Sequence, residues 1–316
     1  MTKYILKRLL SAIPVLIIVA LIVFFMTRLS GGDPARVLLG GDATDEQIAA
    51  VHTEMGLDKP LLEQLMIWIG HLLQGNLGYS YVMQQSVTEA IGSHFGPTIA
   101  IALFGQILAL LVAIPLGVQA ARRKGGWIDQ GIMGFATLTT AFPSFLVGLL
   151  LIALFAVTLR ALPAGGWVEF SQDPAGFFSH LILPAIAVTS LQIAVVTRMT
   201  RSSMVDVLTG DFIRTARAKG LSDRKIVWKH GLKNASIPVL TVVGQSFGAL
   251  IAGTVVVETV FNIPGIGQLV ANSILRRDYT VVQGVLMLTA LAFIIINLIV
   301  DILYAVIDPR IRERSF

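Results

Sequence analysis

The chain has 316 residues, of which 55% are hydrophobic and 14% are charged, and its mean hydropathy is +0.78. This composition excludes a soluble domain with a water-facing surface, so we predict an integral membrane protein. There is no cysteine, which excludes disulfides, thiolate nucleophiles and Cys-based metal sites. The formal net charge is +5, and in a membrane protein the placement of the basic residues is more informative than their sum.

The first apolar run extends from Leu9 to about Met26 and follows the basic residues Lys3, Lys7 and Arg8. At 1.5 Å per residue it is long enough to cross a hydrocarbon core of about 30 Å. It exceeds the roughly 7 to 15 residues of a typical signal-peptide core, and no small-residue cleavage site follows it. Residues 1–29 are therefore predicted to be an N-terminal tail and a retained first span.

Residues 30–96 are expected to lie outside the cytoplasm, because they hold two basic residues against eight acidic ones: Asp33, Asp42, Asp45, Glu46, Glu54, Asp58, Glu63 and Glu89. Thr44 and Gln47 form a capping-box pattern for a helix that Gly56 would end. Pro60 begins a second helix, which is apolar on one face. We expect this second helix to rest on the membrane surface rather than to cross the membrane.

Residues 97–306 are predicted to be a core domain with five further spans. Their approximate bounds are 97–120, 132–159, 181–196, 239–257 and 281–306. The span at 132–159 is longer than one crossing, and Pro143 within it removes a backbone hydrogen bond, so we expect a kink or break there. Residues 162–180 and 261–280 are expected to be outer excursions, and residues 307–316 a cytoplasmic tail.

The basic residues support this arrangement of six spans. Of the 24 Lys and Arg residues, 18 fall on the predicted inner side and 6 on the outer side. We therefore predict an all-α membrane protein with six transmembrane helices, a large extracytoplasmic segment between the first two, and both termini in the cytoplasm. Arg276 and Arg277 are the main exception, so their outer segment is a candidate for a specific contact.

The longest charged interval between two apolar blocks runs from Asp211 to Pro238, in a predicted cytoplasmic loop at residues 200–234. Asp211 is a candidate N-cap for a short helix with Phe212, Ile213 and Ala216 on one side, and Gly220 would end this helix. Ser222 is a candidate cap for a second short helix, which would end before Pro238. The pattern of helix, glycine turn and helix at a membrane surface indicates a docking element.

The sequence RTARAKGLS in this interval resembles the cytoplasmic loop of permease subunits in binding-protein-dependent ABC importers. Ala216 and Gly220 match the second alanine and the glycine of that family's Glu-Ala-Ala pattern, whereas Arg214 and Thr215 depart from its Glu and first Ala. This form is similar to the dipeptide, oligopeptide and nickel branch. Other stretches that resemble this branch follow in the expected order over nearly the whole chain: GGDPAR, GLDKP, GNLGYS, RRDYTVVQG and DPRIR.

The resemblance implies a type I ABC importer permease fold and the import of di- or oligopeptides or related small solutes across the bacterial cytoplasmic membrane. It also implies a coupling loop that seats in a groove of an ATPase subunit and consists of Arg214, Thr215, Ala216, Arg217, Ala218, Lys219 and Gly220. The implied partners are a second permease subunit, two ATPase subunits that bind ATP and Mg, and an extracytoplasmic solute-binding protein. Nucleic acid is not among them, and this chain is expected to be neither an enzyme nor a cofactor carrier.

No motif in the chain predicts catalysis. Residues 244–248 match G-x-S-x-G by letters, but they lie within an apolar helical run instead of between a strand and a helix. A G-x-x-x-x-G-K-[ST] motif is absent, so the chain is not expected to bind nucleotide in the usual way. The five histidines are scattered without i, i+4 pairing, so we predict no metal site from this chain alone. A loose ring of histidines at the external mouth is left as an open alternative.

Two further sets of residues are candidates for packing and transport. Gly244, Gly248 and Ala252 form a small-residue stripe that permits a close helix contact, expected near the second permease. Polar residues within the spans are candidates for lining a pathway, namely Gln192, Gln245, Ser246 and Asn297, although a serine also bonds its own helix. The alternative function is a stand-alone secondary transporter or channel, and the lack of a carboxylate near the middle of the predicted spans argues against a proton-driven one.

Overall fold

The structure is a computed structural model that describes residues 2–29, 35, 39, 44–54 and 56–307. The first elements along the chain are α1 (Thr2–Leu29), α3 (Asp45–Glu54), α4 (Leu61–Leu73), β1 (Tyr79–Ser80), β2 (Gln85–Ser86), α5 (Val87–Arg122), α6 (Trp127–Ala141) and α7 (Ser144–Leu151). They are followed by the π-helix η1 (Ile152–Thr158), α8 (Pro174–Leu208), α9 (Asp211–Ala218), α10 (Asp223–Lys225), the π-helix η2 (Ile226–Gly231), α11 (Leu232–Val260), α12 (Ile266–Leu275) and α13 (Tyr279–Ile307).

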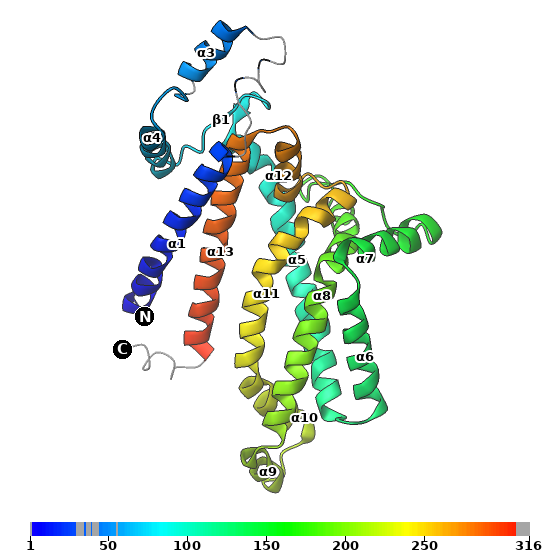
Figure 1. Cartoon of the computed structure of the whole chain (residues 1–316). Coiled ribbons are helices and arrows are strands. Elements are labelled where there is room, and N and C mark those ends of the chain that lie inside the picture. The colour runs from blue at the N-terminus through cyan, green and yellow to red at the C-terminus, as the bar shows by residue number, and fades with distance from the viewer. Residues whose placement is uncertain (1, 30–34, 36–38, 40–43, 55, 308–316) are drawn as a thin grey trace. The chain divides into compact units, whose positions relative to one another are not determined.

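The chain divides into two compact units. The first comprises residues 1–5, 97–264 and 295–316, and the second comprises residues 6–96 and 265–294. In the first unit α8 packs against α6, α7 and α11, as Figure 1 shows, and its main buried cluster includes Ile101, Leu183 and Phe261. In the second unit a smaller cluster around Val87, Leu269 and Val281 joins the start of α5 to α12 and α13.

Within the described residues, α5, α8 and α13 are each long and apolar enough to cross a membrane. Two bent helix pairs, Trp127–Ala141 with Ser144–Thr158 and Asp223–Gly248 with Gly253–Val260, raise the number of candidate spans to five if each pair is one span. The apolar stretch Leu10–Met26 of α1 is shorter than these helices. The chain is therefore helical and multi-pass, and the arrangement of six spans remains a prediction.

Pro143 breaks the helix as the sequence predicts. α6 ends at Ala141, α7 begins at Ser144, and the two segments meet at an angle of 103°. Pro143 occupies the N-cap position of α7, where its missing N–H costs no hydrogen bond. The predicted span at 132–159 is thus a broken pair of helices in which α7 leaves the direction of α6 (Figure 1).

Several helices begin earlier than the apolar runs indicate, because polar caps set their starts. α5 begins at Val87 rather than at residue 97: the Ser86 hydroxyl accepts a hydrogen bond from the Glu89 N–H at 3.1 Å, and the Glu89 carboxylate accepts one from the Ser86 N–H at 3.2 Å. α8 begins at Pro174 rather than at residue 181, because the Asp173 carboxylate accepts from the Ala175 N–H at 3.0 Å. The predicted outer loop at 162–180 is correspondingly shorter.

The segment before α5 has the predicted helices where it is described. The Thr44 hydroxyl accepts from the Gln47 N–H at 3.3 Å, and the Gln47 side chain accepts from the Thr44 N–H at 3.0 Å, which confirms the predicted capping box. Gly56 takes a φ of +64° after α3, and α4 follows Pro60. The predicted outer excursion at 261–280 contains a further short helix, α12.

Candidate functional site

The charged interval folds into a short helix, α9, that is attached by one buried side chain. Ile213 is fully buried, whereas Phe212, Arg214 and Arg217 are exposed. Gly210, with a φ of −69° and a ψ of 152°, takes the N-cap position that the sequence assigned to Asp211. Asp211 is instead the first helical residue, where its carboxylate lies 3.2 Å from the Arg214 guanidinium. The negative charge of Asp211 also interacts favourably with the positive end of the helix dipole.

Gly220 ends α9 in a left-handed conformation, as predicted. Its φ is +77°; its N–H donates to the Arg217 carbonyl at 2.9 Å, and the Leu221 N–H donates to the Ala216 carbonyl at 3.2 Å. These two bonds define a Schellman motif, which turns the chain sharply and satisfies the last carbonyls of the helix. The glycine therefore fixes the direction in which the chain leaves α9.

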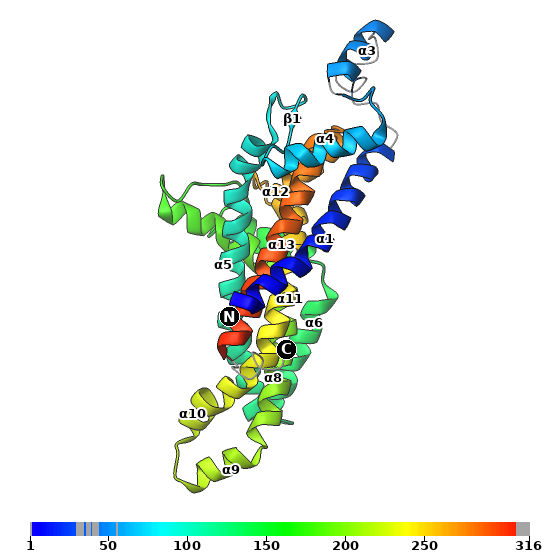
Figure 2. The same cartoon turned by 90° about the vertical axis from the view of Figure 1, so that its left-hand side faces the viewer.

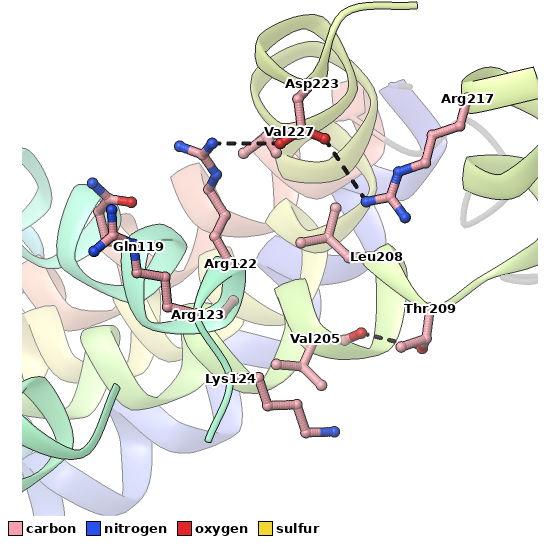
Figure 3. Close-up of a pocket in the computed structure, with 11 residues that line it drawn as sticks. Gln119, Arg122, Arg123, Lys124, Val205, Leu208, Thr209, Arg217, Asp223 and Val227 are labelled. Atoms are coloured by element: carbon pink, nitrogen blue, oxygen red, sulfur yellow. Dashed lines mark hydrogen bonds and ion pairs between the residues drawn. The ribbon is translucent and has the colours of Figure 1, made fainter. Parts of the chain in front are cut away.

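Asp223 connects this turn to the rest of its unit. Its two carboxylate oxygens lie 3.4 Å from Arg122 at the end of α5 and 3.8 Å from Arg217 on α9, as Figure 3 shows. These residues border a cavity of about 360 Å³ that Arg123, Lys124 and Leu208 also line. The pairs are exposed and contribute about 0–1 kcal/mol each, so they orient α9 more than they stabilise it.

The second half of the interval is anchored by apolar contacts. Ile226 and Val227 in η2 are buried, and Val227 packs with Val118 of α5, Met204 of α8 and Ala235 of α11. Ser222 occupies the predicted cap position without a side-chain hydrogen bond. α10, η2 and α11 then follow one another without a break, as Figure 2 shows, so the second helix does not end before Pro238 as predicted. The π-helical turn η2 joins α10 to α11, where the sequence predicted a break between two helices.

A buried ion pair fixes the helices that lead to this interval, and the sequence analysis missed it. Arg201 of α8 donates from Nε and Nη2 to the two carboxylate oxygens of Asp129 in α6, at 2.5 and 2.6 Å. The Gly125 N–H donates to the same carboxylate at 2.9 Å. A signal existed, because a carboxylate in the first turn of an apolar helix needs a partner when it is buried.

The predicted pathway residues lie in different surroundings. Gln192 is buried and donates to the Gln106 side chain of α5 at 2.6 Å, which leaves the Gln192 Oε1 and the Gln106 Nε2 without a hydrogen-bond partner among the described residues. Gln245 is exposed, and the Ser246 hydroxyl donates to the Val243 carbonyl of its own helix at 3.1 Å. Asn297 is half-buried in α13. No cavity found in the described part brings these four residues together.

Two helix contacts add detail to the predicted spans. A Cβ on buried Gly244 would lie 2.6 Å from a Val300 methyl group, so α11 and α13 approach closely at this glycine within the same chain. No contact is described for Gly248, and the Ala252 side chain lies outside the described residues. Glu258, near the C-terminal end of α11, is fully buried and accepts a hydrogen bond from Thr98 at 2.6 Å. It lies one residue beyond the predicted span at 239–257, so the sequence did not place it among the polar residues within the spans.

Comparison with known proteins identifies the family. Residues 113–313 match the family described as binding-protein-dependent transport system inner membrane component, and residues 1–102 match the N-terminal domain of the same membrane components. The chain belongs to this family. It is an ABC transporter permease subunit of the inner membrane, as the RTARAKGLS sequence indicated.

Individual permeases align over almost their full length. The chain is 42% identical over 312 residues to a probable peptide ABC transporter permease protein of Sinorhizobium fredii, covering 99% of this chain and 100% of that protein. It is 45% identical over 314 residues to the glutathione transport system permease protein of Salmonella typhi, with coverage of 99% and 100%. The two relatives therefore match residues 30–96 of this permease as well as its predicted core domain.

A solved structure supports the fold. The MetNI methionine ABC transporter, in an inward-facing conformation, contains a chain that matches 69% of this permease and 96% of its own length, with a TM-score of 0.59 and 16% identity. At this identity the match concerns the fold alone. It confirms the all-helical importer permease fold that the sequence resemblance implied.

Proposed function

We propose that this permease is one of two membrane subunits of an importer for di- or oligopeptides or related small solutes such as glutathione. The observation that carries the proposal is the near-complete alignment with a peptide and a glutathione permease, each at 42–45% identity over 99% of this chain. A solute-binding protein delivers the substrate from outside, and two ATPase subunits hydrolyse ATP with Mg on the inside. This chain supplies the coupling element and half of the pathway.

The proposed arrangement has six spans with both termini in the cytoplasm, residues 30–96 outside and residues 200–234 inside. The charge distribution of the Lys and Arg residues supports it. In this arrangement α9 projects into the cytoplasm, where its exposed Arg214 and Arg217 and the fixed turn at Gly220 suit contact with an ATPase groove. Closure of the ATPase pair then moves α9, and η2 passes the movement to α11.

The buried Glu258 is the observation that favours the alternative, a secondary transporter driven by a proton gradient, because a carboxylate inside a membrane protein is a candidate proton carrier. Its position near the end of α11 and its hydrogen bond from Thr98 favour a structural role instead. A secondary transporter would also have no function for the Schellman turn and the exposed cations of α9.

The test is uptake of radiolabelled dipeptide or glutathione by proteoliposomes that contain this permease together with the second permease, the two ATPases and the binding protein of its transporter. We expect uptake that requires internal ATP and the binding protein and persists when a protonophore collapses the proton gradient. The glutamine variant Glu258→Gln should retain uptake. Uptake by the permease alone, driven by an imposed proton gradient and lost in Glu258→Gln, would replace the importer with the alternative.

A further inference from the structure

The turn between α12 and α13 holds an arginine where glycine is the usual residue. α12 ends in a Schellman motif: the Asp278 N–H donates to the Ser273 carbonyl at 2.8 Å, and the Arg277 N–H donates to the Ile274 carbonyl at 3.1 Å. The residue in the left-handed position is Arg277, with a φ of +56°. Its Cβ makes this conformation unfavourable, whereas a glycine would adopt it freely. An arginine in this conformation therefore suggests a use for its side chain.

The residues beneath this turn fix its position within the second unit. Asp278 is buried and accepts a hydrogen bond from the Ser80 hydroxyl, while its other carboxylate oxygen accepts from the Val281 N–H at 3.3 Å and so caps α13. Thr280 lies against Gly78, where a Cβ would be 2.7 Å from its methyl group. The hairpin of β1 and β2 therefore holds the turn, and Arg277 projects from a rigid support.

The outer surface of the turn combines cations with exposed apolar groups. Leu275 is 82% exposed and Ile274 is 55% exposed, and Arg276 and Arg277 beside them are also exposed. Neither guanidinium makes a hydrogen bond or ion pair with any residue in the described part of the chain. Residues 274–277 are referred to below as the outer basic patch.

We propose that the outer basic patch is a docking surface for a carboxylate-rich face of a folded extracytoplasmic protein. The inference rests on the proposed function, under which this partner is the solute-binding protein. Two exposed arginines beside an exposed leucine fit such an interface, since Arg is enriched at protein–protein interfaces and its guanidinium pairs with carboxylates. Basic residues are the exception on the predicted outer side, where residues 30–96 are strongly acidic.

The positive φ of Arg277 favours a protein partner over a lipid partner. A lipid headgroup is mobile and can approach an arginine on almost any unstrained backbone, so headgroup binding gives no reason to hold Arg277 at a φ of +56°. A folded partner has carboxylates in fixed positions, and a turn whose backbone is held by the contacts of Asp278 reduces the ordering cost of binding. The geometry therefore points to a protein.

The test measures binding of the solute-loaded binding protein to the complete transporter in nanodiscs at several salt concentrations. Arg277→Gly removes the guanidinium and leaves the left-handed turn unstrained, so assembly should be unchanged. We expect the dissociation constant to rise about fivefold or more and its salt dependence to decrease, with the ATPase rate at saturating binding protein unchanged. Leu275→Ser should also weaken binding, without altering the salt dependence.

Arg160→Gly is the matched control, because Arg160 is also exposed with a positive φ, of 50°, and lies on the predicted outer side. The inference is overturned if Arg277→Gly binds like the wild type, if Arg160→Gly loses as much affinity, or if Arg277→Gly impairs membrane assembly, which would indicate lipid anchoring. A wild-type transporter that binds no solute-binding protein at all would refute the proposed function itself, and the docking inference with it.

Discussion

At Gly220 the backbone conformation, rather than space, limits which residue is accepted. Its φ is +77°, and apart from Gly220 itself and its two chain neighbours no atom of the described residues lies within 4 Å of the place that a Cβ would occupy. A β-branched side chain in this conformation costs about 1–2 kcal/mol. That cost is too small to unfold a bundle of membrane helices, but the substitution would distort the Schellman turn that ends α9.

We therefore expect Gly220→Val to insert and assemble normally while substrate uptake falls and ATP hydrolysis no longer responds to the loaded binding protein. Gly220→Asn is the matched control, because asparagine tolerates the left-handed conformation and should keep most of the activity. Both variants are compared by uptake and by stimulated ATPase activity in proteoliposomes. Normal coupling in the valine variant would rule out a role for this turn.

Gly244 presents the opposite case, because there space is the limit. A Cβ at this position would lie 2.6 and 2.8 Å from the two methyl groups of Val300. Gly244→Ala should therefore destabilise the subunit by about 1–3 kcal/mol through overpacking. The thermal unfolding temperature of the purified complex measures this loss.

The double variant Gly244→Ala with Val300→Ala provides the check, since it removes the methyl groups that the new Cβ would meet. It should recover most of the stability lost in Gly244→Ala, which a double-mutant cycle would record as a favourable coupling energy. If the two changes are simply additive, the close contact between α11 and α13 is not the reason for glycine at this position.

Among the elements, α6 and α8 are held together by the pair of Asp129, in the first turn of α6, and Arg201, in the C-terminal half of α8. The side chains are 4% and 27% exposed, and Arg201 contacts both carboxylate oxygens. Arg201→Ala leaves a buried carboxylate without its partner, which costs about 3–5 kcal/mol. We expect a large fall in the yield of folded subunit in the membrane.

The double variant Asp129→Leu with Arg201→Met is the control, because it removes the buried charge together with its partner and should fold better than Arg201→Ala. Folded subunit is measured by fluorescence-detected size-exclusion chromatography of a fusion protein. A double variant that folds no better than the single one would show that the arginine acts through packing alone.

Element boundaries were predictable where the cap is local and recognisable. The capping box at Thr44 and Gln47 and the break at Pro143 occur as predicted. The start of α5 differs from the predicted start at residue 97, although Ser86 and Glu89 have the same capping-box spacing. The apolar run on which the prediction rests begins after this cap. The continuous passage from α10 through η2 into α11 could not be expected, since a π-helical turn has no simple sequence pattern.

Within the candidate site, too, local features could be predicted from the sequence, whereas contacts between helices could not. The glycine turn and the exposed cations of α9 follow from a short sequence, so they could be predicted. Gln106 with Gln192 and Thr98 with Glu258 join different helices. Such pairs depend on the rotation and register of two packed helices, which one sequence does not determine.

For the whole molecule, the proposed orientation places Asp45 outside and Ser222 inside, and both residues are exposed. The absence of native cysteine allows single cysteines at these positions to be labelled without background. An impermeant thiol reagent on intact spheroplasts should label Asp45→Cys, and should label Ser222→Cys only after permeabilisation. The reverse pattern would invert the topology.

The central claim is that α9 contacts an ATPase subunit. A single cysteine at Phe212, which is 47% exposed on α9, is placed in the assembled transporter and labelled with a short thiol-reactive photocrosslinker, which needs no thiol on the partner. A cysteine at exposed Gln172 in the predicted outer loop is the control. We predict that Phe212→Cys is crosslinked to an ATPase subunit, with a yield that changes when ATP binds, and that Gln172→Cys is not. An active complex with no crosslink from Phe212→Cys, or with one from Gln172→Cys, would contradict the account.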